Sequence, residues 1–523
     1  MRRILLLAAV ALTALVGCVR EASDDSRRAD DSRRADWRPS VRWRGFNLLE
    51  MFVWPTSDPT PAYREWDFRQ IRAEGFNFVR LPIDYRYFTH GGDWNAIDEE
   101  RLKAVDQAIA WGEKYGLHVQ VCLHRAPGYC VNPTGKEPAD LFADATAQEV
   151  FARYWGLFAR RWKKWPNRRV SFDLVNEPPK IDEAKYVAAI RPALAAIRAA
   201  DPDRLVFSDG RDGGNLPTFA LAGERGVAQA MRGYKPMSVS HFGAPWCAGL
   251  TASLPPVWPL PEDAPTGLLA GPGKPKLRAP LVIENVPAGE IALHFGGVSE
   301  KVTVRVTGDG ETIKDFTFRP EKGNPNWRSV AEHPKWKILQ GDYLGVETAR
   351  VTRAVKRLEI GLAAGDWCQL TGVRLTATDG RTALLRLVPR FAPPSRFVQR
   401  FVGFGASRSF VSADPPDTTP RRYAEAGLEA LYRSNFKTWD DLAATGAFVM
   451  MGEFGAFRAC PHDVALAWLE DNLRLLKERG WGWALWNWRG TFGVLDSNRT
   501  DVSYEDYDGH RLDRALLELL KRY

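Results

Sequence analysis

The chain has 523 residues, 45% of them hydrophobic, which is enough for one large domain and a smaller one with separate buried cores. Lys and Arg outnumber Asp and Glu by 72 to 64, so the formal net charge is +8. Because these basic residues are scattered among acidic ones and form no continuous stripe, we expect no nucleic-acid partner.

The first residues have the pattern of an export signal. Arg2 and Arg3 precede an apolar run at 4–16 that is too short to span a bilayer as a stable helix. The run closes in LVGC, whose last residue is Cys18, and this tetrapeptide resembles the bacterial lipobox. The resemblance implies a signal peptide at 1–18, lipidation of Cys18, and an exported protein anchored to the cell envelope, at the outer membrane or cell surface. A plain signal peptide with a chance cysteine is the alternative.

A charged repeat follows, in which DSRRAD occurs at 25–30 and again at 31–36. Such a segment has too few apolar residues to bury a core. We therefore predict a tether at 19–38.

The other cysteines are Cys122, Cys130, Cys247, Cys368 and Cys460, an odd number without CxxC spacing. The pattern speaks against a zinc site and allows at most two disulfides after export. We expect no metal or other cofactor.

Short apolar runs that end in a polar or charged residue alternate with amphipathic stretches along the chain, as in parallel α/β proteins. Eight strands are predicted, at 45–49, 76–82, 118–124, 170–177, 205–209, 237–241, 448–453 and 483–488. Eight strands favour a closed TIM (β/α)8 barrel. A doubly wound sheet is the alternative, but no glycine-rich phosphate loop follows the first strand.

The segment between the sixth and seventh predicted strands has a different character, because its β-rich runs are broken by Gly, Pro and Asp. We predict an inserted β-sandwich at 275–390, with a weak resemblance to galactose-binding-like carbohydrate modules. The barrel domain would then comprise 39–260 and 395–523. Since loops after the strands build the functional face of a TIM barrel, the insert is expected on that face.

Polar or aromatic residues stand at the ends of several predicted strands, where TIM barrels carry their functional groups. They are Arg80, His124, Asn176, Glu177, His241, Glu453 and Trp486. The surrounding motifs include RGFN at 44–47, VRLP at 79–82, NEP at 176–178 and GEFG at 452–455. In this order they resemble glycoside hydrolase family 5, the cellulase-like retaining (β/α)8 hydrolases, over the whole chain apart from the tether and the insert.

The resemblance implies cleavage of β-glycosidic bonds with retention of configuration, with Glu177 as acid/base and Glu453 as nucleophile. Such enzymes hold two carboxyls about 5 to 5.5 Å apart. Arg80 would keep Glu453 ionised, and Asn176 would bind the sugar 2-hydroxyl. The alternative is a structural role, in which either glutamate caps a helix and Arg80 is an ion-pair partner.

The remaining candidates are substrate-binding residues by the same resemblance. His124 and His241 would orient the sugar and the carboxylates, and Trp486 would give the sugar ring an apolar floor. Either histidine is alternatively a core residue. Where the family usually has a tyrosine two residues after the sixth-strand histidine, this chain has Gly243, which predicts extra room in the subsite.

The first expected substrate is β-1,4-glucan, as an oligo- or polysaccharide, in a monomeric enzyme. Mannan, xyloglucan, xylan and small β-glucosides remain open. The alternative from another class is a polysaccharide-binding surface lipoprotein without turnover. A barrel enzyme that uses a metal or phosphate would need a His/Asp cluster or a Gly-rich loop, which the sequence lacks.

Overall fold

The structure is a computed structural model. It describes residues 39, 41–54, 63–90, 92–132, 136–247, 254–259, 267–274, 280–333, 336–387, 400–401, 410–411 and 420–523. Cys18, with the predicted signal peptide and tether, lies outside the described residues. The chain divides into two compact units, the first formed by Met1–Gly233, Asn435–Phe454 and Leu476–Trp488 and the second by Tyr234–Ser434, Gly455–Leu475 and Arg489–Tyr523.

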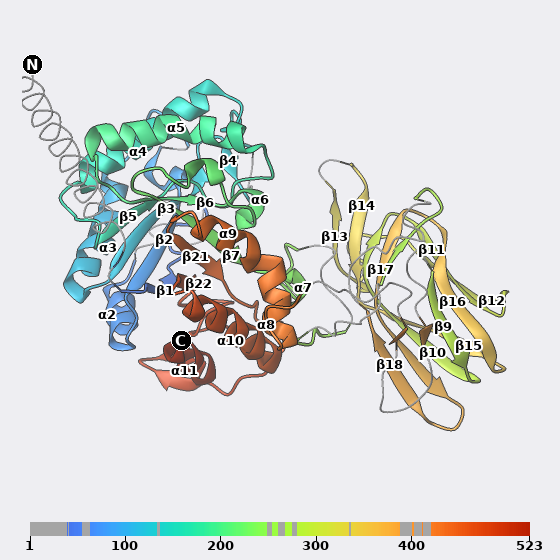
Figure 1. The fold of residues 1–523 in the computed structure, drawn as a ribbon. Coiled ribbons are helices and arrows are strands. Elements are labelled where there is room, and N and C mark those ends of the chain that lie inside the picture. Colours follow the sequence, from blue (N-terminus) through green and yellow to red (C-terminus); the bar gives the residue numbers. More distant parts are fainter. Residues whose placement is uncertain are drawn as a thin grey trace, which may run out of the picture. The chain divides into compact units, whose positions relative to one another are not determined.

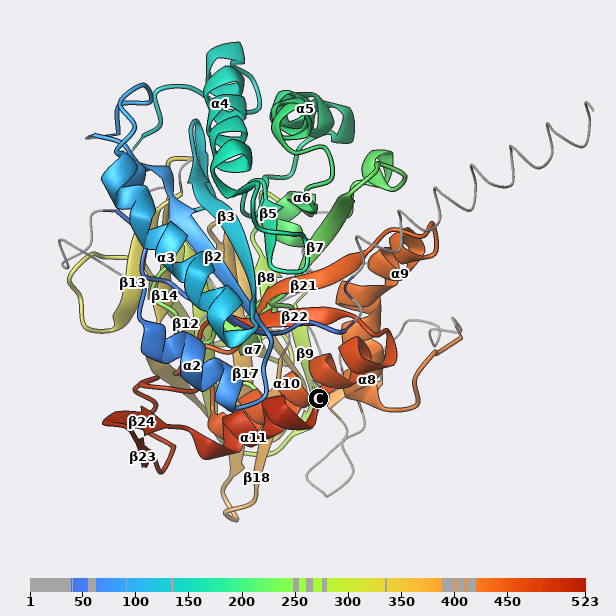
Figure 2. The same cartoon turned by 90° about the vertical axis from the view of Figure 1, so that its left-hand side faces the viewer.

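The first unit contains a closed barrel of eight parallel strands, as Figures 1 and 2 show. In chain order they are β1 (Arg44–Asn47), β2 (Phe78–Asp84), β3 (His118–Ala126), β5 (Val170–Asp173), β6 (Val206–Asp209), β7 (Val227–Gly233), β21 (Val449–Phe454) and β22 (Gly482–Leu485). Pairing of β22 with β1 closes the ring, and β4 (Tyr129–Cys130) forms a short antiparallel hairpin with β3. The predicted TIM barrel is confirmed.

Helices cover the outer face of these strands (Figure 2). They include α2 (Glu65–Ala73), α3 (Glu99–Tyr115), α4 (Ala145–Trp162) and α5 (Glu183–Ala200). Asp98, Asp144 and Asp182 accept backbone N–H groups at the starts of α3, α4 and α5, which satisfies donors that a helix leaves unpaired. Short elements in the loops are η1 (Tyr85–Phe88), α6 (Arg211–Gly214) and η2 (Phe219–Leu221).

The sixth strand was predicted wrongly. The segment at 237–241 forms the short helix α7 (Met237–Ser240), and the sixth barrel strand is β7. The strand escaped prediction because Gln229 and Arg232 interrupt its apolar run, although both side chains are buried in the barrel. The fourth strand is also shorter than predicted, since β5 ends at Asp173 and leaves Asn176 and Glu177 in the loop that follows.

Aromatic side chains fill the barrel at the amino-terminal ends of its strands. Trp43 stacks on His118 with ring centroids 3.8 Å apart and on Phe78 at 5.5 Å, and Phe207 meets Phe448 at 5.9 Å. Burial lowers the pKa of His118 to about 3, so this ring is neutral. The apolar plug leaves the carboxyl-terminal end of the barrel for polar groups.

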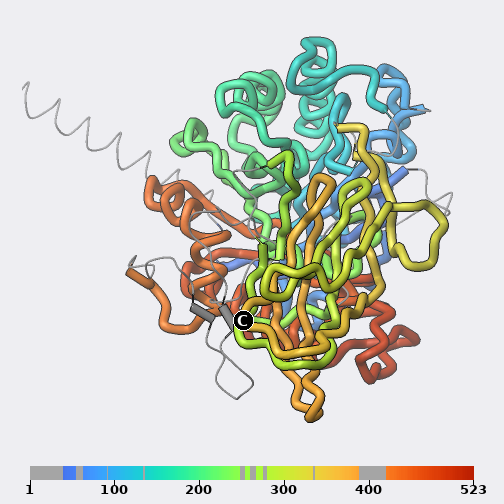
Figure 3. The backbone as a smooth tube through the Cα atoms, turned by 90° about the vertical axis from the view of Figure 1, so that its right-hand side faces the viewer, coloured from blue at the N-terminus to red at the C-terminus, as the bar shows by residue number. Residues whose placement is uncertain are grey.

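The second unit contains antiparallel sheets that lie between β7 and β21 in the chain (Figure 3). One sheet has the order β13-β14-β10-β17-β18, with β15 on β10 and β8 on β17, and the other has the order β12-β11-β16-β9. Their bounds are β8 (Leu268–Ala270), β9 (Leu281–Val286), β10 (Gly289–Ser299), β11 (Val302–Gly308), β12 (Glu311–Phe318), β13 (Trp327–Glu332), β14 (Leu339–Tyr343), β15 (Val346–Val351), β16 (Val355–Ala364), β17 (Trp367–Ala377) and β18 (Thr382–Arg386).

The two sheets share one apolar core, to which alternate residues of β11 (Val302, Val304 and Val306) contribute. This confirms the inserted β-sandwich as an element of the fold. The later elements of the chain are β19 (Arg400–Phe401), β20 (Phe410–Val411), α8 (Ala426–Leu431), the π-helical turn η3 (Tyr432–Phe436), α9 (Lys437–Ala443), α10 (His462–Glu478), β23 (Glu505–Tyr507), β24 (His510–Leu512) and α11 (Arg514–Arg522).

The five cysteines of the described part of the chain are all free thiols. None of the helices in the described residues is both long and apolar enough to cross a membrane.

Candidate active site

Most of the predicted site residues meet at the carboxyl-terminal end of the barrel. Those placed in this first unit are Arg80, His124, Asn176, Glu177, Glu453 and Trp486. Three buried residues that the sequence analysis missed join them, Asp173 at the end of β5, Asp209 at the end of β6 and Arg232 in β7. His241 belongs to the second unit.

Arg80 is fully buried and links several of these groups. Its Nη1 donates to Glu453 Oε1 at 2.6 Å, its Nε to Asp173 Oδ2 at 2.9 Å, and its Nη2 to Asn176 Oδ1 at 2.9 Å. Nη1 also donates to Asn47 Oδ1 at 3.0 Å. The surrounding carboxylates hold the pKa of Arg80 well above its ordinary value, so Glu453 faces a permanent positive charge.

Arg232 is a second buried guanidinium, and it contacts both predicted catalytic carboxyls. Its Nε donates to Glu177 Oε1 at 3.1 Å, and its Nη2 lies 3.1 Å from Glu453 Oε1. Nη1 donates to Asp209 Oδ1 at 3.1 Å and Nη2 donates to Asp209 Oδ2, which makes a two-pronged ion pair. One side chain thus contacts both Glu177, from the loop after β5, and Glu453, from β21.

The backbone of Glu177 is held in an unusual conformation. Its φ is +48°, in the left-handed region that non-glycine residues seldom occupy. Its N–H donates to Asp209 Oδ2 at 2.9 Å, and its carbonyl accepts from the Tyr129 hydroxyl at 2.6 Å. Such strain persists only where the surroundings over-determine it, and it is concentrated at functional sites. Glu177 is therefore fixed through its backbone as well as its carboxyl.

The proton affinities of the carboxyls differ from those in water. Burial, with the charge of Glu453, raises the pKa of Glu177 to about 8. Burial, with the charge of Asp209, raises the pKa of Asp173 to about 7. The cluster holds four carboxyls and two guanidiniums, so protons on Glu177 and Asp173 leave two negative charges against two positive ones. The neutral state of the cluster is one in which Glu177 carries a proton.

Aromatic rings border these polar groups. His124 stacks on Trp486 with centroids 5.7 Å apart and an interplanar angle of 22°, and Phe52 meets both rings edge-on. Burial and the nearby arginines lower the pKa of His124 to about 3, so the ring is neutral. His124 Nδ1 and Asn176 Nδ2 are buried with no hydrogen-bond partner in the described part of the chain. Buried polar atoms are normally paired, so these two are available to a ligand.

In the second unit, His241 lies in an aromatic cluster. Tyr234 lies 4.9 Å from its ring, Phe492 5.7 Å and Trp246 6.3 Å, and Trp246 is 52% exposed. Ser240 Oγ lies 2.9 Å from His241 Nδ1, which fixes the ring orientation.

The interpretation of Gly243 as extra room is wrong. This glycine has φ +74°, and a Cβ built on it would lie only 2.5 Å from the Cβ of Ala459. With β7 as the sixth strand, the tyrosine that follows it is Tyr234, and the residue two positions earlier is Arg232. The departure from the expected His-x-Tyr pattern is therefore an arginine in place of the histidine.

The inserted sandwich contacts the loop after α7 within the second unit. The guanidinium of Arg328 in β13 lies 5.8 Å from the centroid of the Phe242 ring.

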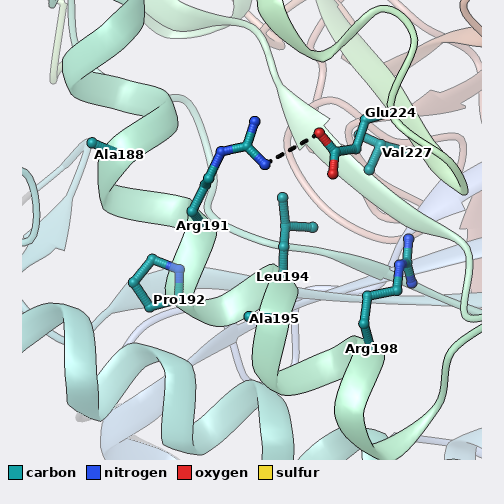
Figure 4. Close-up of a pocket in the computed structure, with 8 residues that line it drawn as sticks. All are labelled: Ala188, Arg191, Pro192, Leu194, Ala195, Arg198, Glu224 and Val227. Atoms are coloured by element: carbon teal, nitrogen blue, oxygen red, sulfur yellow. Dashed lines mark hydrogen bonds and ion pairs between the residues drawn. The ribbon is translucent and has the colours of Figure 1, made fainter.

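A surface pocket of about 530 Å³ lies elsewhere in the first unit (Figure 4). It is lined by residues of α5, by Glu224 and by Val227, which begins β7, and Arg191 pairs with Glu224 there at 3.4 Å. None of the site residues lines it. The described residues also contain no cluster of three or more His, Cys, Asp or Glu side chains arranged to hold a metal ion.

Fold and site together define a (β/α)8 barrel with four carboxyls and two buried guanidiniums at the carboxyl-terminal end of its strands. Residues 38–241 match the family described as Cellulase (glycosyl hydrolase family 5). The chain is 26% identical over 185 residues to Endoglucanase C of Acetivibrio thermocellus. The aligned residues cover 35% of this chain and 53% of Endoglucanase C. The chain is 28% identical over 189 residues to Cellodextrinase A of Ruminococcus flavefaciens, 35% of this chain and 54% of that one.

The chain thus spans about half the length of these curated relatives. A solved structure of a glycoside hydrolase is similar over more of the chain, with 26% identity, a TM-score of 0.55, and coverage of 92% of this chain and 99% of the other. The similarity to glycoside hydrolases therefore extends over the barrel and the insert.

Proposed function

We propose that the protein is a retaining glycoside hydrolase that cleaves β-glycosidic bonds in a β-linked glycan. The observation that carries the proposal is the pair formed by Glu177 and Glu453 on one guanidinium. Glu177 has a pKa raised to about 8, whereas Glu453 also lies 2.6 Å from Arg80. This chemistry requires two neighbouring carboxyls, one that donates a proton and one held beside positive charge as the nucleophile.

In the first step, Glu453 attacks the anomeric carbon and forms a glycosyl ester. The bond from that carbon to the leaving oxygen breaks, and Glu177 gives this oxygen its proton. In the second step, Glu177 takes a proton from water, the water oxygen bonds to the anomeric carbon, and the Glu453 carboxylate is released. Two inversions at one carbon give net retention.

The other groups bind the sugar. The unpartnered Nδ2 of Asn176 is a donor for the 2-hydroxyl, a contact that strengthens in the oxocarbenium-like transition state. Trp486, stacked on neutral His124, provides an apolar surface for the ring. His241, which the family resemblance predicts to bind substrate, lies beside the half-exposed Trp246 in the second unit.

The first substrate we propose is β-1,4-glucan, because the relatives are named endoglucanase and cellodextrinase. Mannan, xylan, xyloglucan and small β-glucosides are the alternatives. A binding protein without turnover is the competing function. The contacts that fix Glu177 and the burial that raises its pKa argue against it, since binding alone needs no such group.

Product stereochemistry tests the proposal. Purified protein is first screened against a panel of aryl β-glycosides and β-glucans to find a β-linked substrate that it cleaves. Proton NMR of that reaction is expected to show the β-anomer first, because the reaction passes through two displacements. An α-anomer formed first would contradict the retaining mechanism. No turnover across the panel would favour the binding protein.

We also propose that lipidated Cys18 anchors the exported protein, on the LVGC motif alone. Cys18→Ser is expected to move the protein from the membrane fraction to the soluble fraction, because a diacylated cysteine is a strong anchor and serine accepts no such group. Detergent partitioning measures the change, with Cys130→Ser as the matched control. Equal partitioning of wild type and Cys18→Ser would refute the anchor.

A further inference from the structure

We infer that Arg232, braced by Asp209, is a positioning residue that orients the acid/base carboxyl of Glu177 and balances the charge of the carboxyl cluster. The inference rests on the proposed function for the roles of the two glutamates. Arg232, on the sixth strand, would orient Glu177, which Arg80 on the second strand does not contact by a hydrogen bond.

The contacts form a closed ring. Arg232 donates to the Glu177 carboxyl at 3.1 Å and to both oxygens of Asp209, and Asp209 Oδ2 accepts the Glu177 N–H at 2.9 Å. The same ion pair therefore holds the side chain and the backbone of Glu177. Because that backbone is in the left-handed region, it depends on such external contacts to keep its conformation.

Arg80 cannot replace this brace. Its hydrogen bonds go to Asn47, Cys122, Asp173, Asn176 and Glu453, and none goes to Glu177. Histidine, expected at position 232 from the family pattern, has two ring nitrogens that point in opposite directions. It cannot make a two-pronged contact with Asp209 and also reach both glutamates, whereas the planar guanidinium has five donors.

The charge of Arg232 matters as well as its geometry. Glu177 is faced by Arg232 from β7, Glu453 from β21, Asp209 from β6 and Arg80 from β2, and the Tyr129 hydroxyl of β4 contacts its carbonyl. Burial, Glu453 and Asp209 raise the pKa of Glu177, whereas the two arginines lower it, and Arg232 lowers it more than Arg80 does. Loss of this positive charge would leave one guanidinium among four carboxyls, and the cluster would take up a further proton.

Four variants separate position from charge: Arg232→Lys, Arg232→Gln, Asp209→Asn and the double variant Arg232→Gln/Asp209→Asn. The first keeps the charge and loses the fork. The double variant removes one charge of each sign and leaves two amides that can pair. The pH dependence of kcat/KM on an aryl β-glycoside with a poor leaving group is the first measurement, because its rate depends on the proton of Glu177, with kcat and KM determined separately.

Arg232→Gln is expected to move both limbs of the pH profile upward by about one pH unit, since carboxyls near one positive charge fewer hold protons more tightly. Asp209→Asn is expected to move them downward, and the double variant should lie near wild type. Arg232→Lys should keep the limbs in place while kcat falls about 100-fold with little change in KM, the effect of a misplaced catalytic group. The inference would be overturned if the limbs of the pH profile did not move in either Arg232→Gln or Asp209→Asn. It would also be overturned if the losses of kcat/KM in these two variants added up in the double variant.

A second measurement works without turnover. In protein labelled with ¹³C at glutamate carboxyls, the signal missing from Glu177→Gln identifies Glu177, and its titration midpoint should rise in Arg232→Gln and fall in Asp209→Asn. If wild type cleaves no β-glycoside, the proposed function fails, yet these midpoints still decide the inference. If Arg232→Gln does not fold by circular dichroism, the midpoint in Asp209→Asn and the kinetics or titration of Arg232→Lys decide it.

Discussion

Replacement of Glu453 by alanine is expected to reduce kcat on β-glycosides by about 10⁴-fold or more, with a small change in KM, because the proposed nucleophile is lost. In the wild type Glu453 is buried, and its Oε1 lies 2.6 Å from Arg80 and 3.1 Å from Arg232, which fixes the attacking oxygen. Initial rates on an aryl β-glycoside measure the loss.

Azide distinguishes loss of the nucleophile from loss of the fold. In Glu453→Ala, external azide can enter the space left by the carboxylate and bond to the anomeric carbon as the aryloxide leaves, which gives an α-glycosyl azide after one inversion. Glu100→Ala is the matched control, since Glu100 is exposed on α3 and pairs only with nearby Lys103 in the described salt bridges. A β-azide product, or full activity in Glu453→Ala, would show that Glu453 is not the nucleophile.

The barrel could be predicted because most of its strands are short apolar runs bounded by polar residues. In β2 and β3 every residue is buried, and a short, mainly apolar run indicates such a strand. In β7 the chain instead places Gln229 and Arg232 inside the barrel, and polar residues in a buried strand carry no apolar signal. The strand predicted at 237–241 is instead α7, whose Met237 and Val239 give the apolar signal that β7 lacks.

Because the sixth strand was predicted wrongly, its Arg232 was not identified as a site residue. Asp209 was placed correctly at the end of the fifth strand, but its role depends on Arg232, and a buried carboxylate is recognisable as functional only with its partner in view. The sequence motifs did identify Arg80, Asn176, Glu177 and Glu453, which the structure brings together. No pattern in the sequence predicts the φ of +48° at Glu177, since that angle follows from tertiary contacts with Asp209 and Tyr129.

Replacement of Glu177 by alanine is expected to produce a loss that depends on the leaving group. On a substrate with a poor leaving group, kcat/KM should fall by about 10²- to 10⁴-fold, the usual contribution of a general acid. A 2,4-dinitrophenyl glycoside needs no proton and should form the glycosyl-enzyme at nearly the wild-type rate.

The wild-type rate on the poor leaving group should decline as the pH rises above about 8, because Glu177 must carry the proton that it donates and its pKa is raised to about 8. In Glu177→Ala, the residual rate on the poor leaving group should show no such decline, because the carboxyl that loses its proton is absent. Rates for both substrates across the pH range measure the effect, with Glu183→Ala on α5 as a control outside the carboxyl cluster. Equal losses on both substrates, or an unchanged decline above pH 8 in the variant, would assign the acid role to another residue.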